Sequence, residues 1–231
     1  MSYIAHCFGK SYNQAKEWLN SNSFNILYVN SQISIISIMN KECYDESVLV
    51  RQCAFNSILL YNYPNLFNIT SKEWVNTLKI EGILNELSHI STEYVLILDG
   101  RDTCILKSLD ESFIQTFNNM NCDIVFNYQS SCYPNNFFKK TKIQHLNAGV
   151  CFGRKDDLLQ FYQECAKNNQ QYKYITEYNN KPSEQYIVKL TAFNTNLKIH
   201  IDNTGQLFYT SSQIELIRKV KLWNNTNQSS L

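Results

Sequence analysis

The stretch YVLILDGRD at residues 94–102 decides the fold. Five apolar residues, 94–98, are followed directly by Asp-Gly-Arg-Asp. A short, uninterrupted apolar run is typical of a strand that is buried on both faces, as in the parallel sheets of α/β proteins. Ligands of open α/β sheets bind at the carboxyl ends of the strands. This stretch therefore predicts a central strand that ends in a polar site.

Helical and strand-like periods alternate on both sides of this stretch. Apolar residues recur at three-to-four spacing over 72–90, which predicts a strong amphipathic helix. Further helices are predicted over 11–20, 45–61, 108–119, 155–167 and 183–193. Strands are predicted over 24–29, 33–39, 123–127, 147–153, 197–201, 206–210 and 215–223. The alternation predicts one α/β domain over 1–231 with a mostly parallel central sheet flanked by helices. Whether the short C-terminal strands add to it antiparallel stays open.

Composition excludes several classes of protein. The chain has 231 residues, and 21 Lys and Arg are balanced by 20 Asp and Glu. A near-neutral chain lacks the basic stripe that general nucleic-acid binding or a polybasic membrane anchor needs. Hydrophobic residues make up 44% and charged residues 18%, as expected of a globular protein rather than a disordered one. No apolar run reaches about 18 residues, so no transmembrane helix is predicted.

The N-terminal residues and the cysteines bear on the compartment. Residues 1–10 lack a basic region followed by an apolar one, so no signal peptide is predicted. The eight cysteines have no C-x-x-C spacing, which argues against a zinc site and favours reduced thiols in the cytoplasm. Gly9-Lys10-Ser11 lacks the preceding glycine and strand of a phosphate-binding P-loop.

Asp99 and Asp102 are the first candidate site residues. Strand geometry alone would point them to opposite faces, but Gly100 allows a turn that brings both carboxylates together. Two carboxylates at a strand end suit Mn²⁺ or Mg²⁺, whose remaining positions a substrate diphosphate can fill. The alternative is that an aspartate only caps the turn before the helix at 108–119.

Two further segments carry candidate residues. In Leu-Asn-Ala-Gly at 146–149, small residues let a ligand approach the backbone, and Asn147 offers both a donor and an acceptor. The alternative for Gly149 is a β-bulge or a turn. Glu184 follows Pro-Ser at 182–183, which predicts a helix start, and it is also a candidate catalytic carboxylate.

Taken in order, these segments resemble the glycosyltransferase domain of procollagen lysyl hydroxylases and related collagen-type sugar transferases, which have a GT-A fold. The resemblance covers roughly residues 72–223. The matching segments are YVLILDGRD at 94–102, DIVFNYQSSCYP at 123–134, HLNAGVCFG at 145–153, SEQYIVKL at 183–190, IHIDN at 199–203 and QLFYT at 206–210.

The resemblance implies transfer of a sugar from a nucleotide-sugar, in particular a UDP-sugar, to a hydroxyl of a sugar or protein acceptor. Asp99 and Asp102 match the carboxylates that hold Mn²⁺ against the diphosphate. Asn147 matches the asparagine near the donor sugar, with Gly149 close to it, and Glu184 matches the second acid before Gln185. Lys79 matches a lysine that meets the diphosphate or the sugar. Cys132 and Tyr133 match a pair in the acceptor-side loop.

The sequence also departs from this family. Ser183 replaces an Asp, Gln129 a Glu and Asn203 a His. The late histidine that supplies the family's third metal ligand would fall after Leu231. The third position would then be taken by water or diphosphate, by a partner, or by a residue outside the family pattern; otherwise the protein is weakly active or inactive. His145 and His200 are given little weight as ligands.

Three functions therefore remain open from the sequence. The first is a metal-dependent glycosyltransferase. The second is a nucleotide-sugar-binding protein that has lost turnover, and Ser183 motivates it. The third is another α/β enzyme acting on phosphorylated sugars, such as a nucleotidyltransferase, although the chain lacks the Gly-rich basic loop near its start that such enzymes need.

Overall fold

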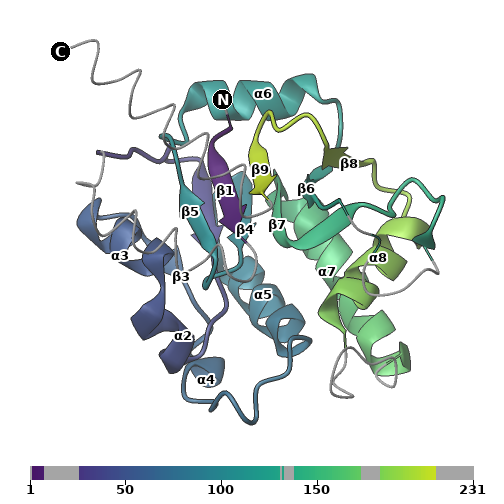
Figure 1. Cartoon of the computed structure of the whole chain (residues 1–231), viewed down its shortest axis with the longest axis horizontal. Coiled ribbons are helices and arrows are strands. Elements are labelled where there is room, and N and C mark those ends of the chain that lie inside the picture. Colours follow the sequence, from purple (N-terminus) through teal and green to yellow (C-terminus); the bar gives the residue numbers. More distant parts are fainter. Residues whose placement is uncertain (1, 8–25, 131, 133–137, 173–182, 212–231) are drawn as a thin grey trace.

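A computed structural model describes residues 2–7, 26–130, 132, 138–172 and 183–211 (Figure 1). The helix predicted over 11–20, the strand predicted over 215–223 and the candidate acceptor residue Tyr133 lie outside these residues.

A six-stranded sheet forms the centre of the molecule, in the order β3-β2-β4-β7-β6-β8. The strands are β2 (Ile33–Ile36), β3 (Leu60–Tyr61), β4 (Tyr94–Leu98), β6 (Ile124–Tyr128), β7 (Leu146–Arg154) and β8 (Ile199–Asp202). Strand β7 runs antiparallel to both of its neighbours, and the other pairs are parallel. The fold is therefore α/β with a mostly parallel central sheet flanked by helices, as predicted.

The antiparallel member of the sheet is internal. It is β7, whereas the late strand β8 pairs parallel to β6, and β9 (Phe208–Ser211) pairs parallel to β1 (Ile4–Cys7). An antiparallel addition of these late strands is therefore excluded. Two parallel strands need a long connection between them. For β6 and β8 this connection includes β7 and the two helices that follow it in the chain.

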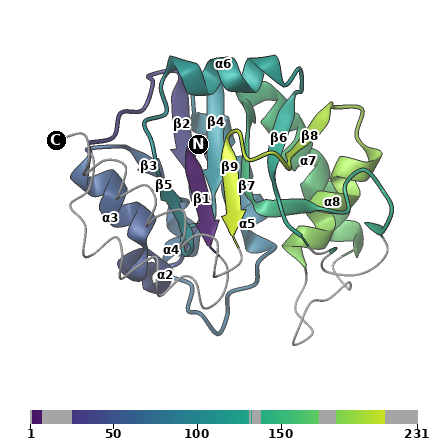
Figure 2. The same ribbon diagram turned by 45° about the horizontal axis from the view of Figure 1, so that its top comes forward.

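A second, three-stranded sheet has the order β5-β1-β9, with β5 spanning Thr103–Ile105. Strand β1 pairs antiparallel to β5, and its His6 stands opposite Thr103. Figure 2 shows this small sheet in front of β4 and β7. The pairing brings the N-terminal strand beside the turn that follows β4.

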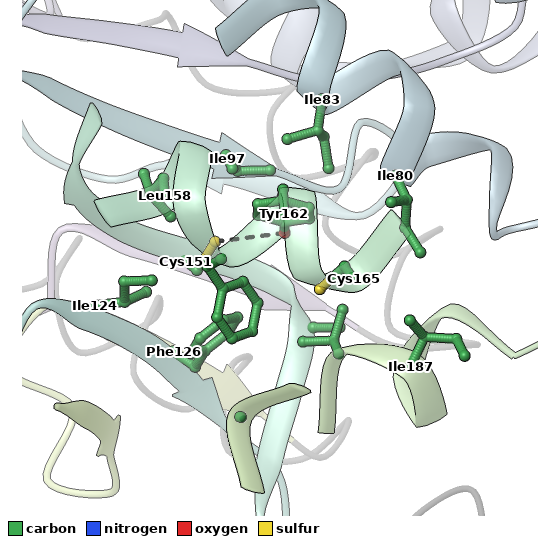
Figure 3. Packing of buried hydrophobic residues seen from close by; sticks show 14 of the residues in the cluster. Ile80, Ile83, Ile97, Ile124, Phe126, Cys151, Leu158, Tyr162, Cys165 and Ile187 are labelled. Atoms are coloured by element: carbon green, nitrogen blue, oxygen red, sulfur yellow. Dashed lines mark hydrogen bonds between the residues drawn. The ribbon is translucent and has the colours of Figure 1, made fainter. Parts of the chain in front are cut away.

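Two apolar cores fill the two sides of the central sheet. The first joins the sheet to α5 (Leu78–His89), α7 (Lys155–Tyr172) and α8 (Glu184–Asn194). Figure 3 shows Ile83 of α5 and Ile97 of β4 around Tyr162 of α7, whose hydroxyl lies 3.8 Å from the Sγ of Cys151. The completely buried Tyr162 and Cys151 make this layer a rigid support for β4 and β7.

The second core lies between the other side of the central sheet and the small sheet. Leu96 of β4 and Phe152 of β7 pack there with Ile4 of β1 and Phe208 of β9. The ring of Phe113, on α6 (Glu111–Asn119), meets that of Phe152 edge-on with centroids 4.7 Å apart. This core holds β1, and with it His6, in a defined place.

Several predicted elements have different limits in the structure. The helix predicted over 45–61 is two helices, α2 (Lys41–Glu46) and α3 (Val48–Phe55), because Ser47 is extended and caps α3 through the amide of Val50. The prediction is wrong over 56–61, where α3 has ended and Leu60–Tyr61 forms β3, paired parallel to β2. The helix predicted over 72–90 begins only at Leu78, after a turn in which Glu73 accepts hydrogen bonds from Thr70.

The strand predicted over 24–29 is absent from its described part, residues 26–29. Val29 makes a single bridge to Leu109, and Ile26 and Tyr28 are exposed, so only Leu27 and Val29 of this segment pack in the second core. The short helix α4 (Pro64–Phe67) completes the described elements. No helix in the described ranges combines the length and apolar character that a membrane crossing requires.

Candidate functional site

The turn after β4 is the structural base of the site. The amide of Asp99 donates to the carbonyl of Gly149 over 2.7 Å, which extends the β4–β7 pairing to the end of the strand. Gly100 then begins the turn. A Cβ at Gly100 would lie 1.8 Å from the Sδ of Met39, so glycine is required here by space and not by a positive φ. The hydroxyl of Ser47 donates to the Gly100 carbonyl over 2.5 Å and fixes the turn.

His6, Asp99 and Asp102 form a cluster at this turn. The Nε2 of His6 lies 3.2 Å from Oδ1 of Asp102 and 3.6 Å from Oδ2 of Asp99. One donor atom from each of the three residues lies within 4.8 Å of the others. The predicted pair of carboxylates therefore does converge, and a histidine joins it.

Sequence reasoning missed His6, which comes from the small sheet. No motif surrounds it, and nothing local indicates that β1 pairs with β5. The two histidines considered for the third position lie elsewhere. The ring Nδ1 of His145 lies 3.0 Å from the carbonyl of Gln129, and His200 stands on β8 opposite Val125.

Lys79 joins the cluster to Glu184. Its Nζ contacts Oδ1 of Asp99 and lies 3.3 Å from Oε2 of Glu184. Lys79 comes from the first turn of α5, and Glu184 from the first turn of α8. Two carboxylates that would repel each other are thus held by one ammonium.

The charges at this cluster support one another. Burial alone would favour neutral His6 and neutral Asp99. Asp102 and Asp99 outweigh that effect and raise the pKa of His6 above its usual value. Lys79 and His6 in turn lower the pKa of Asp99. The pKa of Lys79 is raised, because Asp99 and Glu184 outweigh its burial. The site therefore favours an ionised Asp99, the form that binds a cation, and a protonated His6, which must lose its proton to bind one.

The absence of a side chain at Gly149 leaves space for the side chains of His6 and Asp99. A Cβ at this position would lie 2.3 Å from Cε1 of His6 and 2.5 Å from Oδ2 of Asp99. The interpretation of this segment as a bulge is correct, since Asn127 of β6 pairs with Asn147 while the preceding Phe126 pairs with Cys151. The Oδ1 of Asn147 accepts from the amide of Gly149 over 2.8 Å, which stabilises the bulge.

Glu184 lies where the predicted helix start places it. The hydroxyl of Ser183 accepts from the amide of Tyr186 over 3.0 Å, so Ser183 is the N-cap of α8. Glu184 is buried in the first turn, and the next residue, Gln185, accepts from the amide of Ala148 over 2.7 Å. This contact fastens α8 to the bulge of β7.

The donor set fits a divalent cation. Two carboxylates and one imidazole are suited to Mn²⁺, and the absent side chain of Gly149 keeps the face of His6 and Asp99 clear. Lys79 contacts Oδ1 of Asp99, whereas Oδ2 of Asp99 faces His6 and stays available to a cation. His6, Asp99 and Asp102 are therefore the residues that could hold a metal.

Comparison with known proteins assigns no family. No family model matches the sequence, and no curated protein matches it. Solved structures with a similar chain path include residues 1–349 of TarS from S. aureus, at a TM-score of 0.40 and 13% identity over 78% of this chain. They also include 4-diphosphocytidyl-2C-methyl-D-erythritol synthase from Anaerococcus prevotii DSM 20548, at 0.42 and 11% identity over 87% of this chain and 98% of that protein.

The glycosyltransferase GlyE of Streptococcus pneumoniae TIGR4 is also similar, at a TM-score of 0.38 and 13% identity over 87% of this chain. The chain spans 60% of the TarS fragment and 45% of GlyE. Similarities this low place the chain in none of these families. The resemblance to the lysyl hydroxylase group stays a prediction from the motifs.

Proposed function

We propose that this chain is a metal-dependent glycosyltransferase that uses a nucleotide-sugar, in particular a UDP-sugar, and a hydroxyl acceptor. The observation that carries the proposal is the cluster of His6, Asp99 and Asp102 at the carboxyl end of β4. Such a cluster at the end of a central strand suits a phosphate-bearing ligand in this class of fold. The fold and the order of the motifs support it.

His6, Asp99 and Asp102 would hold Mn²⁺ or Mg²⁺. The ion supplies positive charge for the diphosphate of the donor, which gains charge as the bond to the sugar breaks. His6 offers the third ligand that the family pattern places after Leu231, which supports this function over a nucleotide-sugar-binding protein that has lost turnover.

The neighbouring residues have separate roles in this proposal. Lys79 carries a fixed positive charge beside Asp99, where it can contact a donor phosphate. Glu184, held at 3.3 Å from Lys79, is the candidate catalytic carboxylate on the side of α8. Asn147 and Gly149 lie beside the cluster. Asn147 contributes a side-chain amide there, and Gly149 leaves the backbone accessible to the donor.

The test measures binding and turnover separately. Thermal unfolding is followed with UDP, GDP and CDP, each in Mn²⁺ and in EDTA. A ligand at 100 times its Kd adds about 2.7 kcal/mol, which raises the midpoint by roughly 5–10 °C. We expect such a shift for UDP in Mn²⁺ only, together with UDP release from a panel of UDP-sugars. Asp45→Asn is the control for the loss of a carboxylate, because Asp45 is exposed and paired with Lys41 outside the cluster. Its midpoint should shift with UDP and Mn²⁺ as that of the parent does. No metal-dependent shift with any nucleotide would refute the proposal.

A further inference from the structure

Three side-chain amides lie on the same face of the sheet as Gly149. Asn127 of β6 stands directly opposite Asn147 of β7, and directly opposed residues project to one face. Gln129 follows Asn127 by two positions, so alternation returns it to that face, and its side chain contacts Asn147. Asn147 in turn bonds the backbone of Gly149, the residue against His6 and Asp99. Asn147 thus connects the other two amides to Gly149 and, through it, to the proposed metal site.

Hydrogen bonds fix which way these amides point. The amide hydrogen of Gly149 requires an acceptor, so Asn147 presents its Oδ1 there and its Nδ2 to Gln129. Nδ2 of Asn147 donates to Oε1 of Gln129 over 3.1 Å, so Gln129 must present its Nε2 elsewhere. The Oδ1 of Asn127 accepts from the amide of Tyr128 over 2.8 Å, which directs its Nδ2 away from that bond.

This arrangement leaves two side-chain N–H donors without an acceptor in the described part of the chain. Within the residues that the structure describes, neither Nδ2 of Asn127 nor Nε2 of Gln129 has a hydrogen-bond partner. Asn127 is 0% and Gln129 8% exposed, so water in the bulk solvent does not satisfy them. Buried donors without an acceptor destabilise a fold, and such groups call for a specific explanation.

We infer that Asn127 and Gln129 donate these hydrogens to oxygen atoms of the sugar carried by the nucleotide-sugar, and so determine which sugar the site accepts. The inference rests on the proposed function. Uncharged amides suit the neutral oxygens of a sugar, whereas a diphosphate calls for the charged groups at Lys79 and the metal cluster. A site with donors placed for a substrate oxygen discriminates against ligands that lack it, because the donors then stay unpaired.

The test compares UDP with UDP-sugars by calorimetric titration in Mn²⁺. The probes are UDP, UDP-glucose, UDP-galactose and UDP-N-acetylglucosamine, and the variants are Gln129→Met and Asn127→Leu, which are close in shape to the parent residues. For each protein, the affinity of the best UDP-sugar is divided by that of UDP. We expect this ratio to fall about tenfold in each variant, with UDP affinity unchanged.

Gln52→Met is the matched control. Gln52 is also buried, but its side chain bonds both the amide and the carbonyl of Ile105, at 2.9 and 2.7 Å. Its loss should lower the unfolding midpoint and leave the ratio unchanged. Gln129→Met loses one bond from Asn147 but also removes an unpaired donor, so its midpoint should fall less.

The outcomes separate the inference from the proposed function. A parent protein that binds no UDP in Mn²⁺ refutes the proposed function, and the inference with it. A parent that binds UDP, with an unchanged ratio in both variants, refutes the inference alone. A midpoint that falls as far in Gln129→Met as in Gln52→Met, or a variant too unstable to titrate, shows that the amides serve the fold, for instance through a buried water, and also refutes it.

Discussion

The Nε2 of His6 lies 3.2 Å from Oδ1 of Asp102, although His6 belongs to the N-terminal strand and Asp102 to the turn after β4. This contact exists because β1 pairs with β5, the strand that follows the turn. If the proposed metal site is correct, His6→Ala removes its only imidazole among the described residues. We expect the affinity for Mn²⁺ alone to fall at least about tenfold, as measured by calorimetry.

His200→Ala is the control for this change, because His200 stands on β8 away from the cluster. Its Mn²⁺ affinity should equal that of the parent. Equal affinities in His6→Ala and the parent would remove His6 from the metal set and leave Asp99 and Asp102 alone.

Asp102→Asn keeps the shape of the side chain and removes one negative charge. An amide oxygen binds Mn²⁺ much more weakly than a carboxylate. The metal-dependent part of UDP affinity should therefore collapse, and transfer should fall at least about a hundredfold, or ~2.7 kcal/mol of transition-state stabilisation. UDP titrations in Mn²⁺ and in EDTA measure the first effect, and equal affinities for variant and parent in Mn²⁺ would contradict the assignment.

The same variant also tests the electrostatics of the metal-free site. From sequence alone, removing one of two adjacent carboxylates should leave stability unchanged or raise it. In the structure Asp102 contacts His6, while Lys79 offsets the charge of Asp99. We therefore expect Asp102→Asn to lower the unfolding free energy in EDTA at pH 6, by about 1 kcal/mol. Urea unfolding measures it, and a gain in stability would show that repulsion dominates.

Gly149→Ala alters the site without changing a ligand. The new methyl group would fall 2.3 Å from Cε1 of His6 and 2.5 Å from Oδ2 of Asp99, so one of these side chains must move. Mn²⁺ affinity should fall about tenfold or more. Gly82→Ala, whose methyl group would press on Ile38 inside the core, is the control that disturbs packing alone. Parent-like Mn²⁺ binding in Gly149→Ala would mean that the cluster is not the metal site.

Leu96→Ala tests the placement of the central strand. Leu96 is fully buried in β4, between β2 and β7. Its truncation leaves a cavity in the core that also holds β1, so it should cost about 2–5 kcal/mol of unfolding free energy. Denaturant unfolding measures the loss. A variant that unfolds at the midpoint of the parent would place Leu96 outside the core.

Lys189 predicts a dependence of stability on pH. Burial lowers the pKa of its ammonium from 10.5 to about 8, while its Nζ donates to the carbonyl of Gln144 over 2.7 Å. Between pH 8 and 10 the unfolded chain holds a proton that the folded protein has lost, so folding becomes more favourable as the pH rises. The unfolding free energy of the parent minus that of Lys189→Met should therefore increase from pH 7 to 10, by about 1–3 kcal/mol. Urea unfolding at both values checks this, and a constant difference would show that Lys189 is charged throughout.

Local pattern was sufficient for much of the fold. The apolar run over Tyr94–Leu98 forms the central strand, and the caps at Asp110 and Ser183 begin α6 and α8 close to the predicted positions. One local prediction failed because a second local signal lies within it. Ser47 interrupts the helical spacing over 45–61, because a capping hydroxyl starts a new helix there.

What the sequence by itself determined is the α/β class and the two carboxylates that meet at the end of the central strand. Both follow from interactions between near neighbours: alternating periods along the chain, and a glycine turn between Asp99 and Asp102. Only the tertiary structure decided that His6 completes the cluster and that β7 runs antiparallel. Those facts depend on which strands pair across long separations, and pairing is set by packing in the shared core around Leu96 and Phe152, which no local pattern encodes.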